Sequence, residues 1–337
     1  MCSNCATISL IILGGANQII VKYRSESLSL LSLQAGILRV DESHPQYPIL
    51  SSNYTSKQAG IAGEERVERV FQNHSFPFQH RILHDLSLHS ATTFQIDSLF
   101  LTQFYAILFE VKNISGKLTF RENPRQLIRE RDDGQVDAFD CPAAQVERNS
   151  ELLDLWLQSK GINIPVIGVV VLAYPKQIVL VPPKSTPILF PNLIPSYIRK
   201  IPQNRPILNE KDLDWLCTSM INSHQIYIPN PLSQTYKIQN HDFQTGVICD
   251  RCRYVGMQRI SKKGWHCSHC NHTSKNAHIN AVRDWFLLFG GKMTNKDCRE
   301  FLHINIDTST RILRSMDLIS EGISKGRTYA MDFSKFI

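Results

Sequence analysis

The sequence contains no apolar run of the roughly 18 to 20 residues that a membrane-spanning helix needs. Its longest early apolar run, residues 6–16, has no Lys or Arg before it and no clear small-x-small cleavage site after it, so it matches a secretory signal poorly. Repeats and low-complexity tracts are also absent, and the composition is that of ordinary globular proteins. We therefore expect a cytoplasmic protein of two or three domains with no membrane partner.

The cysteines do not suggest a disulfide framework. There are nine, and four of them form two Cys-x-x-Cys pairs, Cys249 with Cys252 and Cys267 with Cys270. The 14 residues between the pairs are close to the spacing of a four-cysteine zinc ribbon. Four protein ligands fill the coordination shell, so such a Zn²⁺ would be structural. We expect a zinc ribbon at residues 246–273, with free or disulfide-linked thiols as the alternative.

Positive charge is concentrated near the C-terminus. Residues 1–240 carry 22 Lys and Arg against 21 Asp and Glu, whereas residues 241–337 carry 15 against 9. The C-terminal part therefore holds six of the seven net positive charges. This favours a polyanionic partner such as nucleic acid, and a solvated basic surface without a partner is the alternative.

Composition shifts suggest the outer boundaries of the domains. Residues 1–20 have no clear structural pattern. Their Cys2 and Cys5 could be a metal or redox pair, could belong to a disordered tail, or could be encoded because translation is taken to begin upstream of its natural start. We favour a dispensable tail. Residues 182–240 are rich in Pro, Ser and Asn and predict a flank and linker around a helix at 210–221.

Residues 21–181 predict the first folded domain. Apolar residues recur at helical spacing in two segments, and short Ile-, Leu- and Phe-rich runs lie between and after them. The predicted helices are 57–74 and 142–158. The predicted strands are 81–88, 94–101, 105–111 and 166–172, with a hairpin from 118–120 and 126–129.

Three charged residues stand near the ends of two predicted strands: Asp97, Glu110 and Lys112. Side chains alternate along a strand, so Glu110 and Lys112 share a face, and Asp97 can approach Glu110 if the strands pair. Apolar residues surround both carboxylates, and charges at the mouth of a buried sheet need a partner or a metal. The carboxylates can hold Mg²⁺ (or Mn²⁺), while Lys112 can orient water and stabilise charge on phosphate. An exposed cross-strand ion pair is the alternative.

These residues belong to four ordered motifs: Gly63-Glu64-Glu65, Gln95-Ile96-Asp97, Glu110-Val111-Lys112-Asn113 with Gly116, and Gln145. Together they resemble the nuclease-related domain, NERD, of the PD-(D/E)xK restriction-endonuclease-like superfamily, over residues 57–172. The resemblance implies an α/β (α+β) fold with a mixed sheet flanked by helices. It also implies Asp97 and Glu110 as metal ligands, Lys112 as the catalytic lysine, Gln145 as a supporting residue, and Glu65 or, less favoured, Glu64 as the helix carboxylate. Ile96 departs from the proline usual at that position.

The C-terminal residues 277–337 predict three helices and a hairpin. The helices are 277–289, a segment capped by Thr294 that runs through Leu302, and one capped by Asp307 or Thr308 that runs through Met316. This order resembles a winged helix-turn-helix, and a helical packing module is the alternative. The predicted nucleic-acid contacts are Arg148, Arg251, Arg253, Lys262, Lys263, Arg311, Arg314, Lys325 and Arg327.

The combined prediction is a Mg²⁺-dependent phosphodiesterase that a zinc ribbon and a winged helix anchor on DNA. RNA is the alternative substrate, because phosphodiester chemistry does not distinguish the sugars. A non-catalytic DNA-binding or regulatory protein that retains a nuclease fold is the alternative function. The sequence gives no indication of the oligomeric state.

Overall fold

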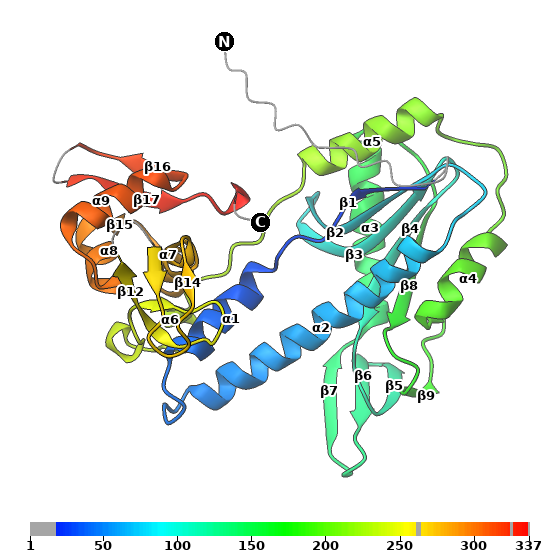
Figure 1. Ribbon diagram of the computed structural model, residues 1–337. Coiled ribbons are helices and arrows are strands. Elements are labelled where there is room, and N and C mark those ends of the chain that lie inside the picture. Colours follow the sequence, from blue (N-terminus) through cyan, green and yellow to red (C-terminus); the bar gives the residue numbers. More distant parts are fainter. Residues whose placement is uncertain (1–17, 261–263, 324–325, 336–337) are drawn as a thin grey trace. The chain divides into compact units, whose positions relative to one another are not determined.

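The computed structural model describes residues 18–260, 264–323 and 326–335, and these form two compact units (Figure 1). Unit 1 comprises residues 18–24 and 59–225 of the described chain, and unit 2 comprises 25–58 and the described residues from 226 onward. The division differs from the predicted one. Residues 25–58 belong with the C-terminal part, and the predicted linker 182–240 is shared between the two units.

Unit 1 is built on a six-stranded mixed sheet with the strand order β1-β2-β3-β4-β8-β10. Strands β2, β3 and β4 form the predicted antiparallel meander, while β1, β8 and β10 each run parallel to a neighbour. The bounds are β1 Gln18–Lys22, β2 His80–His89, β3 Thr93–Thr102, β4 Ala106–Lys112, β8 Val166–Leu172 and β10 Ile188–Leu189. The structure therefore confirms the four strands predicted for this sheet.

Alternation along the central strand β4 divides the core of unit 1 in two. Ala106 and Leu108 pack with α3 (Pro142–Ser159) and α5 (Glu210–Asn222) on one face. Ile107, Phe109 and Val111 pack with α2 (Tyr47–Asn73) and α4 (Ile194–Lys200) on the other. Glu110 and Lys112 continue the first series, because side chains alternate along a strand. The helix predicted at 57–74 is the second part of α2, which begins ten residues earlier.

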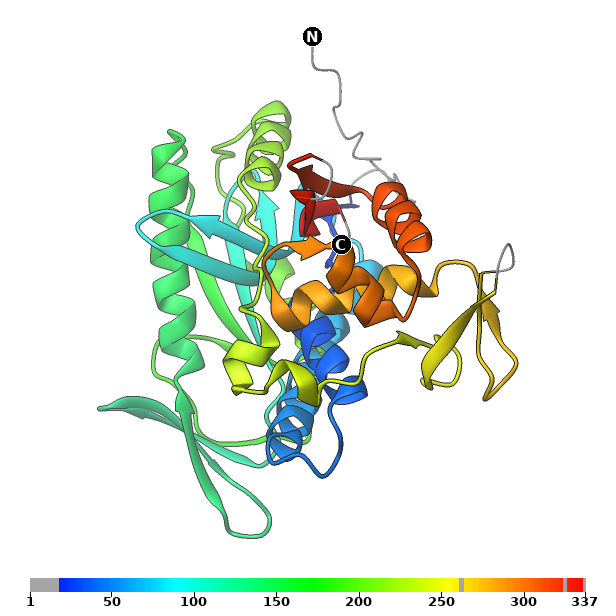
Figure 2. The ribbon, with the colours of Figure 1, turned by 90° about the vertical axis from the view of Figure 1, so that its left-hand side faces the viewer.

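A smaller sheet in unit 1 has the order β7-β6-β5-β9. Its strands are labelled in Figure 1 and appear in green at the lower left of Figure 2. Its strands are β5 Lys117–Glu122, β6 Arg125–Glu130, β7 Val136–Asp140 and β9 Ile178–Val181. Strands β5 and β6 are the predicted hairpin. The other two were not predicted, because most of their side chains are exposed and show no apolar alternation.

The predicted tail over residues 1–20 overlaps strand β1 at its end. Gln18, Ile19 and Ile20 lie in β1 and pair with β2, and the Lys22 ammonium donates to the carbonyl oxygens of His84 (3.0 Å) and Asp85 (2.7 Å). Backbone pairing and these hydrogen bonds hold this segment at the edge of the main sheet. Cys2 and Cys5 lie outside the described residues.

Unit 2 combines helices with two small sheets. Its α-helices are α1 Leu28–Arg39, the first part of α2 (residues 47–58), α6 Leu232–Tyr236, α7 Ala277–Phe289, α8 Asn295–Leu302 and α9 Ile306–Ser315. One sheet has the order β11-β12-β13-β14, with bounds Val247–Ile248, Val255–Ile260, Gly264–His266 and Thr273–Ser274. The other has the order β15-β17-β16, with bounds Met293–Thr294, Thr328–Met331 and Leu318–Glu321.

A buried ion pair joins the early and late segments of unit 2. Arg39, at the end of α1, has no exposed surface and lies 2.9 Å from Asp284 of α7, measured from Nη2 to Oδ2. It also donates to the carbonyl oxygens of Gln244 (3.0 Å) and Gly246 (2.9 Å). Leu28, Leu33 and other apolar residues of α1 share the core with α7. Helix α1 is therefore an integral part of this unit.

The predicted C-terminal helices are present, with one correction. Thr294 caps α8 as predicted, through a reciprocal pair of hydrogen bonds with Asp297. The cap of α9 is Asn305 rather than Asp307 or Thr308, because the Asn305 side chain accepts the N–H of Thr308 (2.9 Å) and the helix begins earlier. Within the described residues, none of the helices is both long enough and apolar enough to span a membrane.

Candidate functional site

The ends of β3 and β4 bring Asp97 and Glu110 together. Ser98 and Phe109 are the last paired residues of this antiparallel ladder, and Asp97 and Glu110 are the next residues along the two chains. The Asp97 carboxylate accepts the N–H of Val111 at 2.7 Å, which fixes it against β4. The Glu110 residue is only 2% exposed. Strand pairing thus creates the carboxylate pair predicted from the sequence.

Lys112 and Gln145 complete this cluster. The Lys112 ammonium donates to Glu110 Oε1 (2.8 Å) and to Gln145 Oε1 (3.0 Å). Gln145 lies in the first turns of α3, which covers the face of the sheet that Glu110 and Lys112 occupy. The cluster therefore joins residues from β3, β4 and α3.

Burial and mutual repulsion shape the electrostatics of the cluster. Desolvation, together with the nearby charge of Asp97, raises the pKa of Glu110 to about 8. Burial also raises the pKa of Asp97, against the lowering effect of the Val111 N–H. Burial alone would lower the pKa of Lys112, but the charge of Glu110 and its hydrogen bond outweigh it and hold that pKa above its ordinary value. Lys112 is therefore a stable cation. The positive charge near the two carboxylates does not offset the cost of burying both of them in ionised form, which is why their pKa values are raised.

The structure distinguishes the two glutamates of α2. Glu65 is exposed, whereas Glu64 is half-buried and its charge acts on Glu110 and Lys112. Adjacent residues of a helix project about 100° apart, so only one of the two can face the sheet. The structure places Glu64, the less favoured of the two predicted candidates, on the side of the cluster, and it leaves the favoured Glu65 exposed.

Arg24 is a member of this site that the sequence did not indicate. Its guanidinium donates to Glu64 Oε2 (2.5 Å), to the Asp97 carbonyl oxygen (2.7 Å) and to Ser98 Oγ (3.3 Å). It follows β1, outside the recognised motifs, and it reaches the site only because β1 joins the sheet. No local sequence signal could have identified it.

Gly63 and Asn113 explain how α2 reaches the sheet. A Cβ on Gly63 would lie 3.0 Å from Ala173 Cβ and 3.1 Å from Asn113 Cβ. The Asn113 side chain also donates to the Ala59 carbonyl oxygen of α2 at 2.8 Å. The glycine that precedes Glu64 and the asparagine that follows Lys112 therefore set the distance between helix and strand.

The carboxylate cluster fits a hard divalent cation. Glu110 Oε2 is buried, and no donor among the described residues reaches it. A buried carboxylate oxygen without a partner is costly, and a cation would satisfy it. Magnesium commonly binds one or two carboxylates and keeps several waters, so Asp97 and Glu110 suffice as protein ligands.

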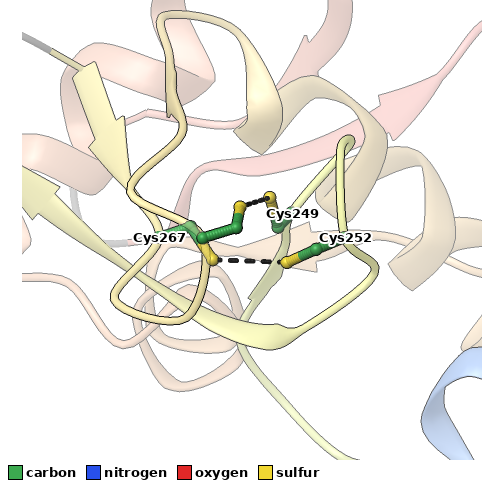
Figure 3. Close-up of side chains that lie close together, drawn as sticks. Cys249, Cys252 and Cys267 are labelled. Carbon is green, nitrogen blue, oxygen red and sulfur yellow. Dashed lines mark hydrogen bonds between the residues drawn. The ribbon is translucent and has the colours of Figure 1, made fainter.

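The four cysteines of unit 2 form a second candidate metal site. Their Sγ atoms all lie within 4.8 Å of one another. Cys249 Sγ lies 3.7 Å from Cys270 Sγ, and Cys252 Sγ lies 3.5 Å from Cys267 Sγ. Figure 3 labels Cys249, Cys252 and Cys267 and marks the sulfur–sulfur contacts with dashed lines. Four sulfurs about 2.3 Å from a tetrahedral zinc would be about 3.8 Å apart. The thiols thus form a candidate structural zinc site.

The two cysteine turns repeat the same backbone pattern. Cys249 N–H donates to the Tyr254 carbonyl oxygen (2.8 Å), and Cys267 N–H donates to that of His272 (2.9 Å). In each turn the residue four after the first cysteine has a positive φ, 64° at Arg253 and 57° at Asn271. This repetition presents four thiols to one point, as the spacing predicted.

The predicted nucleic-acid contacts differ in accessibility. Five arginines are exposed, namely Arg148, Arg251, Arg253, Arg311 and Arg314, while Arg327 is half-buried. Lys262, Lys263 and Lys325 lie outside the described residues. Their exposure leaves the five arginines accessible to a polyanion.

Comparison with known proteins identifies part of unit 1. Residues 59–173 match the family model described as NERD, the nuclease-related domain. The match covers 115 of the 337 residues and contains the whole cluster of Asp97, Glu110, Lys112 and Gln145. No curated protein and no solved structure matches the chain. The chain thus carries a nuclease-related domain, and its C-terminal part has no counterpart in these comparisons.

Proposed function

We propose that this chain is a Mg²⁺-dependent nuclease that hydrolyses phosphodiester bonds at the Asp97–Glu110–Lys112 cluster, with DNA as the preferred substrate. The observation that carries the proposal is the buried Oε2 of Glu110, which has no donor among the described residues although it adjoins a second carboxylate. A structural ion pair would not need two buried carboxylates for one lysine. The match to the nuclease-related domain supports the same interpretation.

The residues of the cluster have distinct roles in this proposal. Asp97 and Glu110 hold the cation, and a bound Mg²⁺ would lower the pKa of a water and neutralise charge on the phosphate. Lys112 is positioned by Glu110 and Gln145 and donates hydrogen bonds to the attacking water or to a phosphate oxygen. In the absence of a bound cation, the charge of Glu110 and its hydrogen bond hold the pKa of Lys112 above its ordinary value, which suits the role of a charged hydrogen-bond donor. Arg24 fixes Glu64 and the backbone of Asp97.

Unit 2 is the proposed nucleic-acid anchor. The four thiols would bind a structural Zn²⁺, and the order of α7, β15, α8, α9, β16 and β17 agrees with a winged helix-turn-helix. Arg311 and Arg314 are exposed on α9, the helix that would enter a groove. The net charge of +6 over residues 241–337 suits a polyanionic substrate.

The test is cleavage of labelled duplex DNA, single-stranded DNA and RNA with and without Mg²⁺. Asp97→Asn, Glu110→Gln and Lys112→Ala should each lower the rate by about a hundredfold or more, because each removes a ligand or an electrostatic contact made in the transition state. Lys117→Ala is the matched control: Lys117 is exposed, pairs with Glu130, and lies outside the cluster.

Stability separates a catalytic loss from misfolding. Glu110 has its pKa raised toward neutrality, so its ionised form is less stable in the fold than in the unfolded chain. Glu110→Gln should therefore unfold at the same or a higher urea concentration than wild type in Mg²⁺-free buffer at pH 7.5. Wild-type rates in all three cluster variants would refute the proposal. Binding without cleavage of any substrate would favour the non-catalytic alternative.

A further inference from the structure

A recess of about 410 Å³ lies between the start of β3 and the first half of α3. Its polar lining residues are Thr92, Thr93 and Gln95 on the β3 side and Gln145, Arg148 and Asn149 on α3. Gln145 is shared with the carboxylate cluster, because its Oε1 accepts from Lys112. The recess is therefore one side chain away from the proposed catalytic lysine.

Two amide side chains in this recess have unused hydrogen-bonding capacity. Gln145 uses its oxygen on Lys112, so its NH₂ group is the end left to donate. Asn149 is only 2% exposed and donates through Nδ2 to the Gln95 carbonyl oxygen at 2.9 Å. No donor within the described residues reaches Asn149 Oδ1. A buried amide oxygen without a donor is rare in folded proteins and suggests a ligand donor.

The charge of the recess favours an anion. No carboxylate lines it, and Arg148 makes no ion pair or hydrogen bond with the described residues. The adjacent Glu147 shows the contrast. Its carboxylate accepts from Arg125 (2.6 and 3.0 Å), Ser185 (3.0 Å) and Thr186 (2.9 Å). Within one turn of α3, the acidic side chain is fully engaged and the basic one is available.

We propose that the recess binds one unpaired nucleotide of the substrate strand, next to the scissile phosphate. Gln145 and Arg148 donate to the nucleotide's phosphate, and Asn149 Oδ1 accepts an N–H or O–H from the base or sugar. The volume exceeds what a phosphate alone would fill and lies in the usual range for ligand pockets, about 300–1,000 Å³. The placement of this nucleotide beside a bond to be cut rests on the proposed nuclease function, but its binding does not.

This assignment has a consequence for the substrate class. A nucleotide can occupy a side pocket only when it has left the base stack, which costs a few kcal/mol in a duplex and much less in a single strand. Single-stranded DNA or a frayed end is therefore the preferred substrate of the site.

The direct test is a ligand-observed NMR titration of the full chain with deoxyadenosine 5′-monophosphate, without added Mg²⁺ and without chelator. A mononucleotide avoids the many phosphate contacts that unit 2 would make with a longer strand. Arg148→Ala should weaken binding by about tenfold, since a charged hydrogen bond is lost. Arg148 is exposed, so this substitution leaves the core intact.

Arg205→Ala is the matched control. Arg205 is exposed, and its loop is held by the hydrogen bond from Ile207 N–H to the Gln103 carbonyl oxygen (2.8 Å). Gln103 follows the last residue of β3, at the opposite end from Thr93. This control should bind like wild type. Equal affinities for Arg148→Ala and Arg205→Ala would overturn the proposal. Binding of inorganic phosphate as tightly as the nucleotide would overturn it as well.

Cleavage assays then separate the two proposals. Wild type should cut a single strand faster than a blunt duplex of the same sequence, and Arg148→Ala should lose most of this preference. If nucleotide binding depends on Arg148 but no substrate is cut, the proposed nuclease function is refuted and the nucleotide site in the recess is supported. If substrates are cut but Arg148→Ala and Arg205→Ala give the same results in every assay, the nucleotide site in the recess is refuted and the proposed nuclease function is supported.

Discussion

Two glycines of α2 offer a test of how the helix is fitted to the sheet that carries the carboxylate cluster. Gly60 and Gly63 lie one turn apart, and each could be replaced by alanine within a helix. At Gly60 a new Cβ would meet no atom within 4 Å. At Gly63 it would lie 3.0 Å from Ala173 Cβ and 3.1 Å from Asn113 Cβ. The same substitution therefore has opposite steric consequences at the two positions.

The expected free energies follow from two opposing terms. Alanine is favoured over glycine in a helix by about 1 kcal/mol, so Gly60→Ala should stabilise the protein by up to that amount. Carbon atoms pack best at about 3.5–4.0 Å, so the contacts at Gly63 are too short by several tenths of an ångström. Both neighbouring atoms are Cβ atoms, which move only with their backbone. Overpacking of this kind costs about 1–3 kcal/mol, so Gly63→Ala should destabilise the protein by about 1 kcal/mol net.

Activity adds a second measurement to urea denaturation. Relief of the clash moves α2 away from β4, which lengthens the bond from Asn113 to Ala59 and displaces Glu64 from the cluster. Cleavage should therefore require more Mg²⁺ in Gly63→Ala than in wild type, and Gly60→Ala should match wild type. If Gly63→Ala proved as stable and as active as Gly60→Ala, the close approach of the helix would not be what holds the site together.

Three further predictions concern the rest of the chain. Metal analysis should find about one zinc per chain. The Cys267→Ser variant should lose the zinc, and the four-cysteine module should unfold while unit 1 stays folded. An ordered module without zinc under reducing conditions would contradict this prediction. Burial, with Arg24 and Lys22 nearby, lowers the pKa of His84 to about 3. As the pH falls, the unfolded chain therefore takes up the proton first, and the free energy of unfolding should fall by about 2 kcal/mol between pH 6.5 and 5. The His84→Asn variant should not show this loss. If urea titrations gave the same pH dependence for wild type and variant, the prediction would be refuted. Arg311→Ala with Arg314→Ala should lower the salt slope of DNA binding by about two, and an unchanged slope would remove α9 from the interface.

Strong local patterns made much of unit 1 predictable. The strands β2, β3, β4 and β8 are rich in Ile, Leu, Phe and Val, and α3 has helical periodicity with Pro142 in its first turn. The pairing of β3 with β4 then follows from their short connection. Asp97, Glu110 and Lys112 could be placed together for this reason, because adjacent antiparallel strands determine which residues become neighbours.

The missing parts of the site depend on contacts that no local pattern encodes. Arg24 reaches Glu64 only because β1 pairs in parallel with β2, more than 50 residues later in the chain. The choice between Glu64 and Glu65 depends on the rotation of α2 about its axis, which the contact of Gly63 with Ala173 sets. Strands β7 and β9 escaped prediction because their exposed side chains lack the alternation typical of a half-buried strand.

The largest difference between prediction and structure concerns the organisation of unit 2. A sequence read in order suggests that the C-terminal modules could be removed near Asn240 to leave an independent nuclease. Helix α1 contradicts this, because its apolar face packs with α7 and its Arg39 is buried against Asp284. Truncation would expose that face and would remove Asp284 together with the carbonyl groups of Gln244 and Gly246 that accept from Arg39. Loss of DNA binding in such a fragment would then report damaged folding as much as a lost anchor. Charge substitutions on α9 leave the core of unit 2 intact, so they are the sounder way to separate anchoring from catalysis.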